Sequence, residues 1–239
     1  MKKMKKCILL ALIFSITSIS LYSQTDTLTH DPQAKAILDK LSKKTESFEA
    51  IRIYFSYSTI NKADSSNSSY EGYLYTKGKD KYKMIIPGNE VFSDGTKVWS
   101  YLKKEAEMNI SWADPNNKSM LTPSSLLTIY EEGFKYSLKG EAVTSISQKV
   151  DGVLKDVKKT LYIIDLYPEN PNETPYSIIR IWIDKDNMKI TNIRYFGKDL
   201  YDYIVDILEF KTDATVPDIL FEFNKANYPA DIEIIDVTE

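Results

Sequence analysis

The stretch from Tyr82 to Tyr101, YKMIIPGNEVFSDGTKVWSY, limits the possible folds more than any other part of the chain. Pro87-Gly88 and Asp94-Gly95 are turn dipeptides, and the second is a strong signal for a two-residue hairpin. The short runs around these turns are loaded with apolar and aromatic side chains. We therefore expect three short strands joined by tight turns, which place one apolar face on a strongly curved sheet.

Most of the remaining chain also has the pattern of strands. Ala50 to Ile60 alternates apolar and polar side chains, which predicts a half-buried strand. Further candidate strands are 70–76, 108–112, 135–139, 144–150, 159–167, 176–184, 189–196, 201–210 and 221–235. Roughly ten or eleven antiparallel strands with two or three short helices indicate a mostly β (α+β) fold. One curved sheet roofed by the helices is the simplest arrangement, because helices are too few for parallel βαβ layers.

Two helices are predicted by their start signals and apolar spacing. Asp31-Pro32 is a helix start followed by an apolar stripe, and this helix should end near Ser47. Thr122-Pro123 begins a second, shorter helix, and Gly133 is its expected stop. The first helix could cover a filled core or act as a movable cover over a ligand cavity, and the sequence favours neither. The unusually wide apolar face of the second suits a helix laid over a hydrophobic opening. The stripe residues are Ala34, Ile37, Leu38 and Leu41 in the first helix and Leu126, Leu127, Ile129, Tyr130 and Phe134 in the second.

The N-terminal segment has the features of an export signal. Four lysines precede the apolar run from Ile8 to Ile19, and Ser23 offers a small residue before a cleavage point at Gln24. An uncleaved anchor is the alternative, but the run is short for a bilayer span. We expect residues 1–23 to be a signal peptide, 24–30 a flexible tail and 31–239 one domain in the periplasm.

The mature chain would be acidic and free of cysteine. The only cysteine, Cys7, lies in the predicted signal peptide, and removing that segment takes the net charge from −3 to −7. Packing must then stabilise the fold without disulfides, although the compartment is oxidising. This charge makes nucleic acid and anionic lipid surfaces poor candidates for partners.

Recognisable catalytic and metal-binding motifs are missing from the sequence. The single histidine, His30, cannot make an HExxH pair, and there is no phosphate-binding glycine loop or GxSxG motif. The run from Asp184 to Asn187 begins like a calcium loop but lacks the later ligands and glycine, so a hairpin turn is favoured. We predict that the protein is not an enzyme and needs no cofactor or metal.

Five segments, in this order, resemble the LolA-type carriers of outer-membrane lipoproteins in the periplasm. EGYLYTK (71–77) resembles that family's second strand, and SDGTKVWSY (93–101) is similar to its SDGKxxWxY stretch, with Thr96 at the lysine position. YEEGFKY (130–136), FGKD (196–199) and the closing FEF…IEIID (221–236) resemble a Bacteroidetes-like branch. The resemblance covers about residues 31 to 239. The family's lid-latching arginine would fall near Gly78, so no latch residue is assigned.

This resemblance implies an incomplete β-barrel of about eleven strands, with a helical lid over a hydrophobic cavity for acyl chains. It also implies loading by an inner-membrane lipoprotein-releasing ABC transporter complex, with acylated lipoproteins as cargo and the outer-membrane acceptor left open. We expect a monomer. On this basis the predicted acyl-chain cavity is Phe55, Tyr57, Leu74, Tyr82, Met84, Ile86, Val91, Trp99 and Tyr101. The predicted lid is Ile37, Leu38, Leu41, Leu126, Leu127 and Tyr130.

Other readings of the same residues remain open. Each predicted cavity residue could equally fill an ordinary core, since core and cavity residues look alike in sequence. A lipid-binding sensor or envelope-stress regulator of the same architecture is the main alternative to a carrier. A structural envelope protein and an unrecognised hydrolase are further alternatives. Lipid that copurifies with the protein would separate the carrier, the sensor and the filled core.

Overall fold

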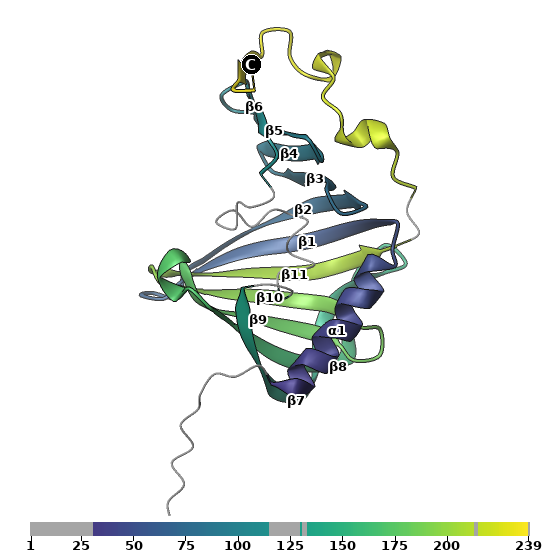
Figure 1. Cartoon of the computed structure of the whole chain (residues 1–239), viewed down its shortest axis with the longest axis vertical. Helices are drawn as coiled ribbons and strands as arrows, with labels where there is room; N and C mark the ends of the chain where they lie inside the picture. The colour runs from purple at the N-terminus through teal and green to yellow at the C-terminus, as the bar shows by residue number, and fades with distance from the viewer. Residues whose placement is uncertain (1–30, 115–129, 131–132, 213–214, 239) are drawn as a thin grey trace, which may run out of the picture.

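The computed structural model describes residues 31–114, 130, 133–212 and 215–238. They form a mostly β fold, an incomplete barrel in which one sheet of 12 strands stays open (Figure 1). The strand order is β12-β6-β5-β4-β3-β2-β1-β11-β10-β9-β8-β7. The strands are β1 (Ala50–Asn61), β2 (Asn67–Lys77), β3 (Lys81–Ile86), β4 (Asn89–Asp94), β5 (Lys97–Leu102), β6 (Glu107–Trp112), β7 (Phe134–Val150), β8 (Val153–Pro168), β9 (Tyr176–Asp184), β10 (Lys189–Gly197), β11 (Tyr201–Lys211) and β12 (Glu233–Asp236).

The stretch from Tyr82 to Tyr101 forms three antiparallel strands, β3, β4 and β5, as predicted. Gly88 adopts a φ of 86° in the first turn, and Gly95 a φ of 95° in the second. These are left-handed values that favour glycine. The loop between β4 and β5 consists of Gly95 and Thr96, because Asp94 is the last residue of β4. The Asp94 carboxylate accepts hydrogen bonds from the backbone N–H groups of Thr96 and Lys97 in this turn.

The second half of the chain differs from the prediction in two places. The two strands expected at 135–139 and 144–150 are one long strand, β7, because a bulge near Gly140 keeps the pairing with β8 continuous. The closing strand expected at 221–235 is only β12, preceded by the short 3₁₀ helices η3 (Asp218–Phe221) and η4 (Lys225–Asn227). β12 also pairs parallel to β6, so the sheet is not wholly antiparallel.

The helix α1 (Pro32–Glu46) covers one face of the sheet, in front of the strands from β8 to β11 (Figure 1). Asp31 caps it as predicted: one carboxylate oxygen accepts from Gln33 N (2.8 Å) and Ala34 N (3.2 Å). The other oxygen accepts from Leu138 N (2.9 Å), and Asp31 N donates to Tyr136 O (3.2 Å). The start of α1 is therefore fixed to β7, at one edge of the sheet.

The two faces of the sheet have separate cores. On the helix face, the apolar stripe of α1 is buried in a core built by β1, β2, β3 and β8 to β11. On the opposite face, residues 215–238, here called the strap, cover β4, β5 and β6 and the adjoining ends of β1 and β2, so we name it the strap face. The strap leaves the end of β11 and reaches β6, where β12 extends the sheet (Figure 1). The strap residues that pack on this face are Val216, Leu220, Phe221, Phe223, Tyr228 and Ile232.

Candidate functional site

The helix face has a filled part and an open part. Beneath α1, the side chains of Ile164, Ile179 and Ile181 are completely buried, so this part is an ordinary packed core. Further along the sheet, on β1, β3 and β4, apolar side chains pack against this core but stay partly exposed. We call this set the apolar patch; it consists of Tyr57, Met84, Ile86 and Val91, together with Tyr70, which is 37% exposed.

The register of β2, β3 and β4 explains how the patch forms. Leu74 pairs with Met84, and Met84 pairs with Val91, so these side chains project from the same face. A Cβ on Gly72 would lie 2.8 Å from Phe55 Cζ and 2.9 Å from Ile86 Cγ2. The missing side chain of this glycine therefore lets the side chains of β1 and β3 close over β2.

The structure brings together seven of the nine residues predicted to line the cavity. Tyr57, Met84, Ile86 and Val91 belong to the apolar patch, whereas Phe55, Leu74 and Tyr82 are buried in the adjoining core on the same face. Burial also raises the pKa of the Tyr82 hydroxyl. The seven form a continuous apolar wall with a buried base and a partly exposed rim.

Trp99 and Tyr101 lie on the strap face instead. Trp99 pairs with Phe92, which is next to Val91 in β4 and therefore projects from the opposite face. The Trp99 and Phe92 rings stack with centroids 5.4 Å apart, and Tyr101 meets the edge of Tyr228 in the strap at 4.9 Å. Counting the alternation through the Gly95-Thr96 loop would have separated these two residues from the patch.

The predicted lid residues are only partly covered by the structure. Ile37, Leu38 and Leu41 are buried between α1 and the sheet, and Tyr130 is buried in the same core. Leu126 and Leu127, with most of the predicted second helix, lie outside the described residues. In the described part, α1 thus covers a filled core.

A group of tyrosines, of which the sequence analysis singled out only Tyr57, extends from the patch along the helix face. The Tyr57 ring stacks on Tyr70 at 5.0 Å and lies 6.3 Å from Tyr203, and the Tyr195 ring meets the edge of Tyr176 at 5.6 Å. The register pairs Tyr195 with Tyr203 across β10 and β11. We call these five residues the tyrosine belt. Its members come from five strands, so only strand order and register could have revealed it.

The side chains of the belt become more deeply buried from Tyr70 towards Tyr195. Burial, with smaller effects of Tyr70 and Tyr203, raises the pKa of Tyr57 to about 12. Burial also raises the pKa of Tyr176 and, more strongly, of Tyr195. The Tyr195 hydroxyl is buried and has no hydrogen-bond partner among the residues that the structure describes. These phenols are neutral at physiological pH and can act as hydrogen-bond donors in an apolar environment.

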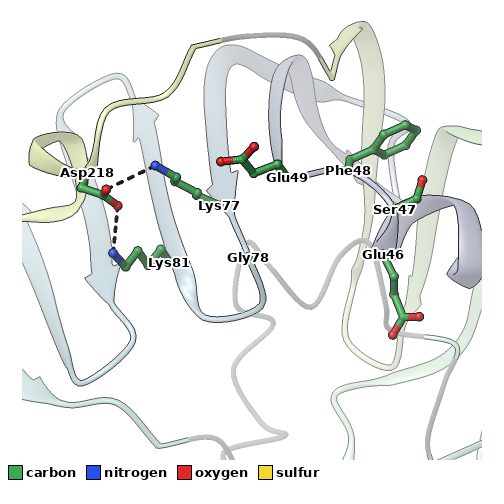
Figure 2. Close-up of a pocket in the computed structure, with 8 residues that line it drawn as sticks. All are labelled: Glu46, Ser47, Phe48, Glu49, Lys77, Gly78, Lys81 and Asp218. Carbon is green, nitrogen blue, oxygen red and sulfur yellow. Dashed lines mark hydrogen bonds and ion pairs between the residues drawn. The ribbon is translucent and has the colours of Figure 1, made fainter.

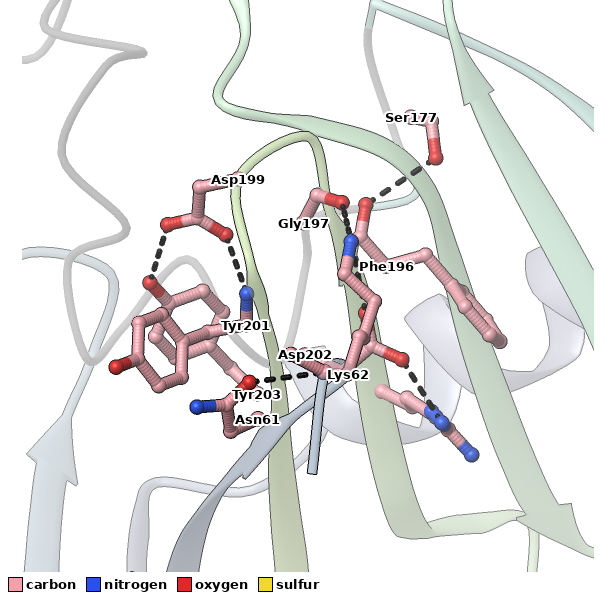
Figure 3. Close-up of polar contacts among 11 residues, drawn as sticks. Asn61, Lys62, Ser177, Phe196, Gly197, Asp199, Tyr201, Asp202 and Tyr203 are labelled. Carbon is pink, nitrogen blue, oxygen red and sulfur yellow. Dashed lines mark hydrogen bonds and ion pairs between the residues drawn. The ribbon is translucent and has the colours of Figure 1, made fainter. Parts of the chain in front are cut away.

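Polar contacts fix the loop that follows β1 and the loop that joins β10 to β11 (Figure 3). Lys62 Nζ donates to the Gly197 carbonyl oxygen (2.7 Å), and Arg194 donates to Asp202 (2.8 Å). The Tyr203 hydroxyl donates to the Asp199 carboxylate (3.0 Å), so this tyrosine, unlike Tyr195, has a partner. The cluster fixes the backbone around the belt.

Of two further pockets, one lies outside the apolar patch and the other borders it at Ile86. The first, of about 500 Å³, lies between the end of α1 and the turn from β2 to β3 (Figure 2). Asp218 of the strap accepts there from Lys77 (3.3 Å) and Lys81 (2.8 Å). The second, of about 340 Å³, is lined by both Ile86 and Tyr101, together with polar side chains. The charged lining of the first pocket does not suit an alkyl chain.

The turn at Gly78 contacts the end of α1. Gly78 N donates to the Glu49 carbonyl oxygen (3.1 Å), and Lys79 Nζ lies 3.7 Å from the Glu46 carboxylate. Both charged side chains are exposed, so this ion pair contributes little to holding the helix.

Within the described parts of the chain, no cluster of three or more potential metal ligands occurs. None of the helices described is long and apolar enough to cross a membrane.

Comparisons with known proteins give similarity in structure but not in sequence. No protein-family model matches the chain, and no curated protein matches it. An uncharacterized conserved protein from Thermus thermophilus is similar with a TM-score of 0.53 and 13% identity, over 85% of this chain and 99% of the other. LprF from Mycobacterium bovis gives a TM-score of 0.44 and 11% identity, over 79% and 98% of the two chains. A LolA superfamily protein from Nitrosomonas europaea gives 0.42 and 11%, over 80% and 97%. Similarity at such low identity concerns the fold alone.

Proposed function

We propose that this protein is a periplasmic carrier of the Bacteroidetes-like LolA branch, which moves acylated lipoproteins from the inner to the outer membrane. It would bind their acyl chains on the helix face and catalyse no reaction. One observation carries the proposal: the apolar patch leaves Tyr57, Met84, Ile86 and Val91 partly exposed next to a fully packed core. The resemblance of five sequence segments to LolA-type carriers supports it.

The physical requirement is a dry surface that holds and releases an alkyl chain. Each buried methylene contributes roughly 0.8 kcal/mol, so a long chain gains on the order of 10 kcal/mol. The patch offers contacts without directional bonds, and the flexible thioether of Met84 can follow the contour of different chains. The packed core beneath the patch keeps this surface in place when the cargo leaves.

The patch can be tested by placing a charge on it. Met84→Asp should weaken binding of a diacylated lipopeptide at least about tenfold, because the carboxylate would have to be desolvated beside the alkyl chain. Ile85→Asp is the matched control, since Ile85 is the adjacent residue in β3 and pairs with Tyr73 and Glu90 on the strap face. Both variants should keep the far-ultraviolet circular dichroism of the wild type. Equal binding by Met84→Asp and the wild type would remove the patch from the site.

A second experiment separates a carrier from a lipid sensor. Lipid that copurifies from the envelope would be identified by mass spectrometry. Lipoprotein acyl chains would support the carrier, and their loss after depletion of the lipoprotein-releasing ABC transporter complex would identify the loading partner. Free fatty acid or phospholipid would support the sensor or stress regulator, and absence of lipid would support a filled structural core.

A further inference from the structure

The Tyr195 hydroxyl is a buried polar group for which the described residues provide no partner. The side chain is 4% exposed and lies on the helix face, with its ring against the edge of Tyr176. A buried donor without a partner is unfavourable, so each such group in a native protein needs an explanation. Its neighbour across the strand pair, Tyr203, has its hydroxyl bonded to Asp199.

The belt connects this hydroxyl with the apolar patch. Tyr70 and Tyr57 belong to both, and exposure falls from Tyr70 through Tyr57 to Tyr195. Burial is the largest cause of the raised pKa of Tyr195, and the smaller effects of Tyr176 and Tyr57 agree with the three phenols lying close together. A ligand with alkyl chains against Met84 and Ile86 would lie beside the belt, and its polar end would have to enter between the belt rings to reach the buried Tyr195 hydroxyl.

We propose that Tyr195 donates a hydrogen bond to the carbonyl oxygen of an ester-linked acyl chain, and that the site thereby selects acyl esters. This inference rests on the proposed function and specifies its ligand class. A phenol hydroxyl can satisfy a carbonyl oxygen in a dry site at no charge-burial cost. A free carboxylate fits less well, because the described buried side chains include no lysine or arginine to neutralise it.

The test compares 1,2-dioctanoylglycerol with its dioctyl ether analogue, which has the same chains without the carbonyl groups. Wild-type protein should bind the ester about threefold to tenfold more tightly, the range expected for one net hydrogen bond. Tyr195→Phe should bind both lipids with the affinity of the wild type for the ether. Tyr54→Phe is the matched control and should keep the ester preference, because Tyr54 is next to Phe55 in β1 and projects from the opposite face, where its hydroxyl donates to Glu71.

The thermal stability of the lipid-free protein separates a ligand-binding hydroxyl from a structural one. Tyr195→Phe removes an unpaired buried group, so its melting temperature should equal or exceed that of the wild type. A lower melting temperature with the ester preference retained would show that the hydroxyl has a structural partner, and would overturn the inference. Equal binding of ester and ether by the wild type would also overturn it. If the wild type bound neither lipid, the proposed function itself would fail.

Discussion

Leu41→Ala tests whether α1 is a fixed part of the core or a cover that opens. The Leu41 side chain is 1% exposed, and it shares the apolar stripe of α1 with Ile37 and Leu38. Truncating such a leucine costs about 2–5 kcal/mol, from the lost transfer energy and from the cavity that remains. If α1 unfolds only with the whole domain, we expect a loss of about 3 kcal/mol in the free energy of unfolding.

Urea denaturation followed by circular dichroism and by tryptophan fluorescence measures this loss. Lys40→Ala is the matched control, because Lys40 is the adjacent exposed residue of the same helix and its truncation should change stability by less than about 0.5 kcal/mol. Amide hydrogens in α1 should exchange only through near-global unfolding. A loss below about 1 kcal/mol for Leu41→Ala, with tighter lipid binding, would refute the fixed helix and favour an opening lid.

Three further predictions concern the sheet, the strap and the helix cap. Gly72→Ala should lower the free energy of unfolding, measured by urea denaturation, by about 1–3 kcal/mol, because the new Cβ would lie 2.7 Å from a backbone carbonyl oxygen of β3. An unchanged free energy of unfolding would mean that β2 and β3 separate easily. Phe221→Ala should lower the free energy of unfolding by about 3–5 kcal/mol, because the Phe221 side chain is fully buried. Ile219 lies in the same 3₁₀ helix but is 61% exposed, so Ile219→Ala should lower it by less than about 0.5 kcal/mol. Similar losses for the two variants would show that the strap is not packed as described. Burial acts to raise the pKa of Asp31, but hydrogen bonds from three backbone N–H groups outweigh it and hold the pKa below its usual value. The stabilisation that these hydrogen bonds give to the folded state is fully present above the unfolded pKa of about 3.9, and it is lost as pH falls through the lower folded pKa. The stability difference between the wild type and Asp31→Asn should therefore narrow as pH falls from about 5 to about 2, and a constant difference would exclude the carboxylate charge as its cause.

The sequence predicted those parts of the fold that depend on local patterning. The alternation from Ala50 predicts β1 within one residue, and 176–184 matches the bounds of β9. Asp31-Pro32 and the apolar stripe predict α1, because capping and helical spacing involve neighbouring residues only.

Features that depend on distant contacts could not be predicted in the same way. The parallel pairing of β12 requires the strap to cross the sheet, and the single strand β7 requires a bulge that the pattern alone does not show. Trp99 was grouped with Met84 by proximity in sequence, whereas pairing across two hairpins places their side chains on opposite faces. Tyr195 joins the tyrosine belt only because β10 and β11 lie beside β1 in the strand order.

Photocrosslinking tests the central claim most directly, because it shows which face of the sheet meets the alkyl chain. A diacylated lipopeptide with a diazirine near the end of one acyl chain would be bound, irradiated, and its adducts mapped by peptide mass spectrometry. Binding on the helix face predicts adducts at Tyr57, Met84, Ile86 or Val91. Adducts confined to Phe92, Trp99 and the strap, or no saturable adduct at all, would contradict it.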